Sequence, residues 1–307
     1  MAAEPRYLGA DEIRRRLPPA QARQAIAGAY LALARGELEG PVRTGLGAGA
    51  ETSLIMPALS PGHIGVKVLH LRPGNPAAGR AAVVGEMLIW DRETGGLLGV
   101  IDAAALTAVR TAALAGHATR LLAPPAVRRV ALLGAGGQGY DQALALVEAT
   151  GAGELRIWNR TGERARALAE RLGPELSGVA VTVADTAREA VADAGAVTLV
   201  TASPSPLLAA GDLAAEVHLN AMGGYRPDMA EIGPDIISGA SAVLVDNVPG
   251  AQAEAGELIQ AAALGHLDLS GLQDLRAVRG DRRGWTVFKS VGAAIFDLAM
   301  AERLLEA

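Results

Sequence analysis

A glycine-rich turn between an apolar run and a helical pattern is the feature that most constrains the fold of this chain. The run Val130–Leu133 leads into Gly134-x-Gly136-x-x-Gly139, and a helical pattern follows to Thr150. Such glycines allow a tight turn and a close approach of the backbone to a pyrophosphate at the helix N-terminus. An ordinary loop is the alternative in a chain with 38 glycines, and the flanking strand and helix favour a dinucleotide site. The predicted contacts are Gly134, Gly136, Gly137, Gln138 and Gly139.

Beyond this turn, short apolar runs alternate with helical or loop segments. Strands that alternate with helices form parallel, doubly wound sheets. We therefore predict an α/β fold with a Rossmann-type nucleotide-binding domain over residues 120–288. The further strand candidates are 154–158, 179–183, 197–201, 217–221 and 242–245.

The residues before this domain have the pattern of a smaller α+β module. A helical pattern over Ala20–Arg35 precedes several extended runs, and Asp91–Gly96 has the composition of a hairpin turn. Asp102 is a candidate N-cap for a helix that ends near Leu122, before two prolines. We predict a substrate-binding and dimerisation domain over residues 1–119, completed by a C-terminal helix within 289–307. The extended runs are 52–56, 64–71 and 81–90.

Charge and composition exclude several classes of protein. The 28 Lys and Arg residues against 33 Asp and Glu give a net charge of −5, which disfavours nucleic-acid binding. The absence of cysteine excludes disulfides and thiolate metal sites, and we expect no metal. No apolar stretch reaches the roughly 18 residues of a membrane span, and the first residues do not resemble a signal peptide. We expect a soluble cytoplasmic protein that does not bind membranes.

The end of the second predicted strand bears on the choice of cofactor. An acidic residue about 20 positions after the glycines usually binds the ribose 2′-hydroxyl of NAD. Here the strand ends in Asn159-Arg160-Thr161, whose side chains can donate to a 2′-phosphate. A solvated loop arginine is the alternative. The segment favours NADP(H), with NAD(H) possible.

Three basic residues lie in apolar or glycine-rich settings: Arg43, Lys67 and Arg110. Strand alternation places Lys67 on the face opposite Val66 and Val68, and Arg110 lies on a helix of small apolar residues. A cation on such a surface needs an anionic partner, which a substrate carboxylate could supply. A structural ion pair is an equally good explanation for each cation taken singly.

The order of several short motifs resembles that of the ornithine cyclodeaminase/mu-crystallin family. The resemblance covers nearly the whole chain from about Leu17. It implies a two-domain NAD(P)-dependent enzyme of amino-acid or imine metabolism, dimeric through the non-nucleotide domain. The motifs are Gly65-Val66-Lys67, Asp91 to Gly95, Leu106 to Ala113, Gly134-Ala135-Gly136, His218 to Ala221 and Val287 to Ser290.

The resemblance also implies roles for individual residues. Arg43 and Arg110 would hold a substrate α-carboxylate, and Lys67 would be the catalytic residue that contacts the carboxylate or the reacting nitrogen and relays a proton. The remaining cofactor contacts that it implies are Thr111, Asn159, Arg160, Thr161, Thr201, Ala202, Ser203, Met222 and Ser290.

Departures from the family pattern bear on the reaction. Ornithine cyclodeaminase has an Asp where this chain has Tyr225, and a Glu where it has Leu54. Without these acids, the substrate site has no groups for the amines of a diamino acid, and Leu54 and Tyr225 become substrate-pocket residues. Asp228 could replace the missing acid, although a helix N-cap is the simpler interpretation. His70 could be an acid near Lys67, although a partly buried strand histidine is the simpler interpretation.

The sequence thus predicts an NADPH-dependent reductase that converts carboxylate-bearing imines to amino acids. Cyclic ketimines such as pyrroline- or piperideine-2-carboxylate are the first candidates, followed by imines of 2-oxo acids. One alternative is an amino-acid cyclodeaminase that recycles NAD internally. Another is a crystallin-like protein that binds NADP and a small ligand without turnover.

Overall fold

The structure is a computed structural model that describes residues 4–48, 51–279 and 283–306. Its contacts divide the chain into two compact units, Met1–Arg110 with Ala293–Ala307, and Thr111–Gly292. The first division falls inside helix α3 (Ala103–Leu122). The domain boundaries that the sequence suggests, at 119/120 and 288/289, stay predictions.

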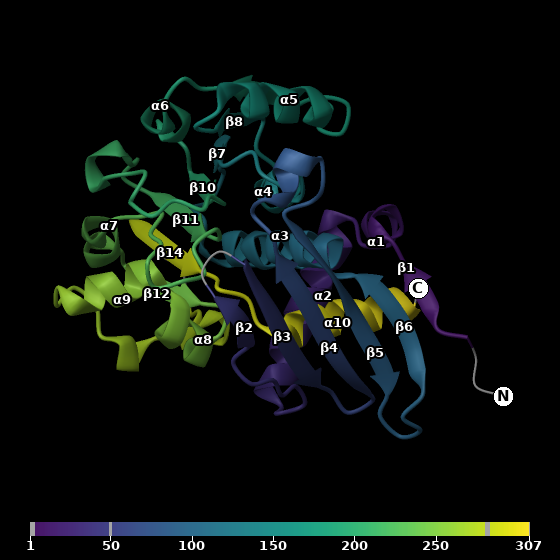
Figure 1. Cartoon of the computed structure of the whole chain (residues 1–307). Helices are drawn as coiled ribbons and strands as arrows, with labels where there is room; N and C mark the ends of the chain where they lie inside the picture. The colour runs from purple at the N-terminus through teal and green to yellow at the C-terminus, as the bar shows by residue number, and fades with distance from the viewer. Residues whose placement is uncertain (1–3, 49–50, 280–282, 307) are drawn as a thin grey trace. The chain divides into compact units, whose positions relative to one another are not determined.

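A six-stranded sheet forms the centre of the first unit, in the order β1-β6-β5-β4-β3-β2 (Figure 1). Strands β2 to β6 pair antiparallel, and β1 lies parallel to β6. The predicted hairpin turn joins β5 to β6, where the backbone N–H of Thr94 donates to Asp91 Oδ1 at 2.7 Å. The strands are β1 (Arg6–Leu8), β2 (Thr44–Ala48), β3 (Glu51–Leu59), β4 (His63–Leu71), β5 (Val83–Asp91) and β6 (Leu97–Asp102).

Helix α10 (Ala294–Glu306) covers one face of this sheet, where it contacts β3, β4 and β5 and packs against α2 (Pro19–Ala34) (Figure 1). The short helix α1 (Ala10–Arg16) precedes α2. Along β4, the side chains that face α10 are Gly65, Lys67 and Leu69, and all three are buried. A Cβ on Gly65 would lie 2.4 Å from Met87 Cε, so a larger residue there would have to displace the end of the Met87 side chain.

Helix α3 begins where the sequence predicts it. The backbone N–H of Ala105 donates to Asp102 Oδ1 at 2.9 Å, which is the bond of a side-chain N-cap. The helix ends at Leu122, before Pro124 and Pro125. The N-cap prediction for Asp102 is thus confirmed by the geometry.

The second unit contains an eight-stranded sheet, in the order β13-β12-β14-β11-β10-β7-β8-β9, and every pairing in it is parallel. This arrangement confirms the predicted fold class. Strand β14 was not among the predicted strands, although it lies between β11 and β12. The strands are β7 (Arg129–Leu133), β8 (Glu154–Trp158), β9 (Ala180–Val183), β10 (Ala196–Leu199), β11 (Val217–Ala221), β12 (Ala242–Val245), β13 (Gln273–Asp274) and β14 (Trp285–Lys289).

The core of this unit lies in two apolar clusters. One includes Leu219, Val245 and Val287 from β11, β12 and β14, and the other includes Leu132 and Ile157 from β7 and β8.

In the described part of the chain, no helix combines the length and apolar character that crossing a bilayer requires. The helices are α4 (Gly139–Thr150), α5 (Gly162–Leu172), α6 (Ala187–Val191), α7 (Pro234–Gly239), α8 (Val248–Glu254) and α9 (Gly256–Ala263).

Candidate active site

Lys67 lies at the centre of the first unit with its side chain fully buried. Its position on β4 directs the side chain toward α10, where Nζ donates to Asp297 Oδ2 at 2.6 Å. Nζ also donates to Thr107 Oγ1 on α3 at 3.2 Å. The lysine is thus held by one carboxylate and one hydroxyl.

Arg110 shares the same carboxylate. Its Nε donates to Asp297 Oδ1 at 3.1 Å, and the residue is 5% exposed. Within the described residues, the two Nη atoms of Arg110 form no hydrogen bond. Because a guanidinium binds a carboxylate best through two parallel N–H groups, these atoms are the natural contact for an anionic ligand.

The surroundings of Lys67 lower its pKa to about 7. Burial is the largest cause, and the positive charges of Arg110 and Arg43 act in the same direction. Asp297 opposes them through its charge and its hydrogen bond, and the desolvation of the ammonium outweighs that attraction. A lysine with this pKa can both hold and release a proton near neutral pH.

The structure places the other predicted residues of the first unit as follows. Arg43 precedes β2, is partly buried and lies close enough for its charge to act on Lys67. Leu54 on β3 pairs with Leu69, two positions from Lys67 and on the same face of the sheet. His70 lies on the opposite face, where its Nδ1 is 2.8 Å from Ser53 Oγ. It is therefore not an acid beside Lys67.

The glycine-rich turn of the second unit has the geometry that the sequence predicts. Gly134 has a φ of +121°, and a Cβ there would lie 2.6 Å from the carbonyl oxygen of Val200. Gly139 begins α4 and lies close to the carbonyl oxygen of Gly134. No side chain caps the N-terminus of α4. These features fit the pyrophosphate of a dinucleotide.

In the loop after β8, the side chain of Asn159 is hydrogen-bonded within the protein, whereas that of Arg160 is exposed. Asn159 accepts from the backbone N–H of Ala135 at 3.0 Å through Oδ1 and donates to the carbonyl of Thr161 at 2.9 Å. Its amide therefore supports the glycine-rich turn. Arg160 is exposed and has no hydrogen bond or ion pair to the described residues. Its guanidinium is available for a 2′-phosphate.

Two buried atoms near the predicted cofactor contacts have no hydrogen-bond partner in the described chain, Thr111 Oγ1 and Gln138 Oε1. Orphaned polar atoms of this kind fit a site that a polar ligand completes. The hydroxyls of Thr201 and Ser290, in contrast, have hydrogen-bond partners, since they donate to Glu231 and Asp246 at 2.9 and 2.7 Å. Met222 is buried, and Ala202 and Ser203 lie in the loop that follows β10.

The segment around Tyr225 differs from one expectation. We expected Asp228 to cap a helix that starts at Met229, but no helix begins there and α7 starts at Pro234. Asp228 instead binds Arg226, with Nε to Oδ1 at 2.9 Å and Nη2 to Oδ2 at 3.1 Å. The two residues are exposed and lie two positions apart in the sequence, so Arg226 supplies hydrogen-bond donors to both oxygens of the Asp228 carboxylate. Tyr225 follows Gly223 and Gly224 in the loop after β11.

Sequence reasoning missed five buried charged residues that organise these sites. Asp297, for example, is a single charge within the apolar segment Ala-Ile-Phe-Asp-Leu-Ala. Such a charge on the buried face of a helix or at the end of a core strand was the available signal. The five residues are Glu231, Asp246, Glu257, Lys289 and Asp297.

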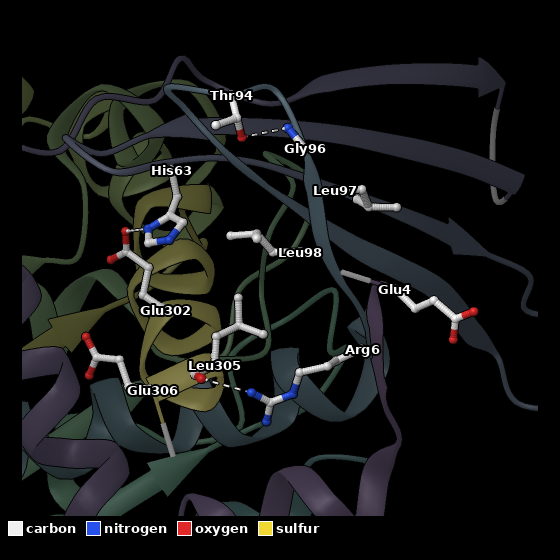
Figure 2. Close-up of a pocket in the computed structure, with 10 residues that line it drawn as sticks. All are labelled: Glu4, Arg6, His63, Thr94, Gly96, Leu97, Leu98, Glu302, Leu305 and Glu306. Carbon is white, nitrogen blue, oxygen red and sulfur yellow. Dashed lines mark hydrogen bonds and ion pairs between the residues drawn. The ribbon is translucent and has the colours of Figure 1, made fainter. Parts of the chain in front are cut away.

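A pocket of ≈ 470 Å³ lies in the first unit. Figure 2 shows His63 and Glu302 on its wall, with Nδ1 and Oε1 2.8 Å apart, and Arg6 donating to the carbonyl of Leu305 at 2.9 Å. It contains none of the predicted site residues. Among the described residues, no group of His, Asp and Glu has the arrangement of a metal site.

Comparisons with known proteins show which family the chain belongs to. The model of the ornithine cyclodeaminase/mu-crystallin family matches residues 7–307. The chain is 32% identical over 295 residues to a Delta(1)-pyrroline-2-carboxylate reductase of Bacillus cereus, covering 91% of this chain and 90% of the relative. It is 30% identical to the ketimine reductase mu-crystallin of Mus musculus, covering 98% and 97%.

Solved structures of related enzymes have the same fold as this chain. The Delta(1)-pyrroline-2-carboxylate reductase of Thermococcus litoralis, solved with NADH and L-proline, superposes with a TM-score of 0.92 at 26% identity, covering 100% of this chain and 97% of the other. An archaeal alanine dehydrogenase dimer with bound NAD gives 0.88 at 28% identity, covering 99% and 96%. The chain is a nicotinamide-dependent oxidoreductase that belongs to the ornithine cyclodeaminase/mu-crystallin family.

Proposed function

We propose that this enzyme reduces a carboxylate-bearing imine to an amino acid with NADPH. The observation that carries the proposal is the double use of Asp297, which binds Lys67 Nζ and Arg110 Nε and leaves both Nη atoms of Arg110 without a partner in the described chain. When Lys67 is protonated, these two cations exceed the charge of Asp297 by one. An anionic substrate would offset that excess.

The residues of the first unit would have different roles in the reaction. Arg110, with Arg43, would bind the substrate carboxylate and fix the orientation of the imine. Lys67 would deliver a proton to the imine nitrogen, for which its pKa of about 7 is suited. The bound cofactor supplies the hydride that the imine carbon receives. One hydride and one proton together convert C=N to CH–NH.

Cyclic ketimines are the substrates that the site supports best. Leu54 supplies an apolar side chain on the face of the sheet that Lys67 shares. Relatives at 30–32% identity are named for pyrroline-2-carboxylate or ketimine reduction. An apolar ring with one carboxylate and one imine nitrogen matches a site of two arginines, one lysine and a leucine.

Arg160 supports NADPH as the cofactor. Its side chain is exposed and unengaged within the described chain, at the end of the strand whose tip contacts the adenosine ribose in dinucleotide-binding domains. No acidic residue lies at Asn159, Arg160 or Thr161 to repel a 2′-phosphate.

The test is nicotinamide oxidation with NADPH and NADH in parallel, on pyrroline-2-carboxylate, piperideine-2-carboxylate and pyruvate with methylamine. We expect faster oxidation of NADPH with at least one cyclic ketimine. Tight cofactor binding without oxidation of either cofactor on any of these imines would contradict the proposal. Ammonia release from ornithine without net cofactor change would show a cyclodeaminase.

We also propose that the enzyme is a homodimer that pairs through the sheet of the first unit. The face away from α10 carries exposed apolar side chains, among them Leu46, Ile64 and Val84, which are 54%, 38% and 39% exposed. Leu46, Ser53, His70 and Val84 are paired neighbours on strands β2 to β5, so this face extends over four strands. Light scattering should give twice the chain mass, and Val84→Asp should shift it to the monomer. A monomer in the wild type would contradict this proposal.

A further inference from the structure

Glu231 is a fully buried carboxylate that accepts four hydrogen bonds from two separate loops. Its Oε1 accepts from the backbone N–H of Thr201 at 2.6 Å and from Thr201 Oγ1 at 2.9 Å. Its Oε2 accepts from the backbone N–H groups of Gly223 at 2.6 Å and Gly224 at 3.3 Å. All four acceptor positions are therefore occupied, as expected of an ionised carboxylate.

The two loops follow neighbouring strands of the parallel sheet. Thr201 lies after β10, and Gly223 and Gly224 lie after β11, which pairs with β10. The loops approach closely, because a Cβ on Gly223 would lie 1.9 Å from the carbonyl oxygen of Thr201. Ligands of open α/β sheets bind beyond the carboxyl ends of such strands. Glu231 therefore connects two loops at the edge where a cofactor would bind.

A second buried pair, Lys289 and Glu257, also holds this segment. Lys289, at the end of β14, donates to the carbonyl of Gly224 at 2.7 Å and to Glu257 Oε1 at 3.0 Å. Lys289 and Glu257 are both buried, and Glu257 Oε2 has no partner among the described residues. Burial raises the pKa of Glu231, the nearby charge of Glu257 adds to this, and Lys289 and the backbone N–H groups oppose it.

We propose that Glu231 is a positioning residue for the cofactor and substrate contacts of the second unit. It fixes Thr201 and the Gly223–Gly224 pair, and so sets the places of Met222 and Tyr225 on either side of that pair. This inference rests on the proposed function for the roles of Met222 and Tyr225. The hydrogen bonds that carry it are independent of the substrate.

The test compares Glu231→Gln with two controls. The amide has one oxygen in place of two, so its NH₂ group must face the N–H groups of one loop, and that loop loses its acceptor. Glu216→Gln makes the same chemical change at an exposed position before β11. Val191→Ala opens a cavity in the buried core at α6, where the apolar side chain makes no hydrogen bond to either loop, and reports the effect of lost stability.

Cofactor affinity is measured by NADPH fluorescence titration at a temperature below every Tm, which needs no substrate. We expect the Kd of Glu231→Gln to rise on the order of tenfold or more, while Glu216→Gln matches the wild type and Val191→Ala loses Tm with little change in Kd. A Kd for Glu231→Gln within about threefold of the wild type, or no larger a loss than Val191→Ala shows, would overturn the inference. If no imine is reduced, the proposed function fails separately from this result.

A measurement on the wild type covers the case in which Glu231→Gln does not fold. Amide hydrogen exchange of the cofactor-free enzyme should show the N–H groups of Thr201 and Gly223 protected, because Glu231 binds them before any cofactor is present. Exchange of both amides at the rate of an open loop would overturn the inference.

Discussion

Asp297 on the C-terminal helix binds Lys67 across 230 residues of sequence, with Nζ 2.6 Å from Oδ2. Both side chains are fully buried, and the second oxygen of the same carboxylate binds Arg110. A buried carboxylate between two cations is stable only as a set, because each charge compensates for the desolvation of the others. The C-terminal helix thus supplies the group that holds the predicted catalytic lysine.

We predict that Asp297→Asn shifts the pH dependence of the reaction to lower pH. Asp297 raises the pKa of Lys67, so its loss takes that pKa below its wild-type value of about 7. If protonated Lys67 is the acid, activity falls as pH rises through its pKa. The alkaline limb of kcat/KM should therefore move to lower pH, and an unmoved limb would exclude Lys67 as its source. The exposed Asp11→Asn is the matched control.

Lys67→Met should lower turnover by orders of magnitude and leave NADPH binding unchanged. Methionine fills a similar volume without a proton, and loss of a general acid costs about 10²–10⁴-fold in rate. The nucleotide turn lies in the other unit, so the fluorescence titration with NADPH should match the wild type. Equal loss of cofactor affinity would contradict the role assigned to Lys67.

Local patterns were enough to predict most of the fold. The spacing of apolar residues identified β8 and β11 with their observed bounds, and Asp102 marked the start of α3. Strand β14 (Trp285–Lys289) was missed. Its central place in the sheet depends on pairing with β11 and β12, which no local pattern specifies.

The site was predictable only where a residue type has an unusual setting. Lys67 and Arg110 stood out as cations in apolar segments, whereas their partner Asp297 lies far away in the sequence. Thr201 and Ser290 were expected to contact the cofactor, and the structure shows their hydroxyls bound to Glu231 and Asp246. Pairings between distant buried charges depend on the tertiary fold, so a single sequence does not reveal them.

Arg160→Ala should weaken NADPH binding and leave NADH binding nearly unchanged. A hydrogen bond to a charged group contributes about 1.5–3 kcal/mol, so the Kd for NADPH should rise roughly 10- to 150-fold. Arg164→Ala removes the same charge from an exposed position four residues later and serves as the control. Equal effects on the two cofactors would show that Arg160 does not bind the 2′-phosphate.

Acid should destabilise the enzyme through His218, which is fully buried on β11. Its Nδ1 lies 2.9 Å from Thr286 Oγ1 and its Nε2 lies 3.0 Å from Asn220 Oδ1. Burial lowers the pKa of His218 from 6.5 to about 4, and its two hydrogen bonds only partly oppose this. Between these two values the unfolded chain binds the proton more tightly, so stability is lost as pH falls from 6.5 toward 4.

The size of this effect can be measured by urea unfolding at several pH values. The shift corresponds to at most about 3.5 kcal/mol in the free energy of unfolding, since each pKa unit is about 1.4 kcal/mol. His218→Gln cannot take up the proton, so its stability should fall less steeply between pH 6.5 and 5 than that of the wild type. His266→Gln, at an exposed histidine, should keep the wild-type slope. Identical slopes for wild type and His218→Gln would show that His218 does not cause the acid sensitivity.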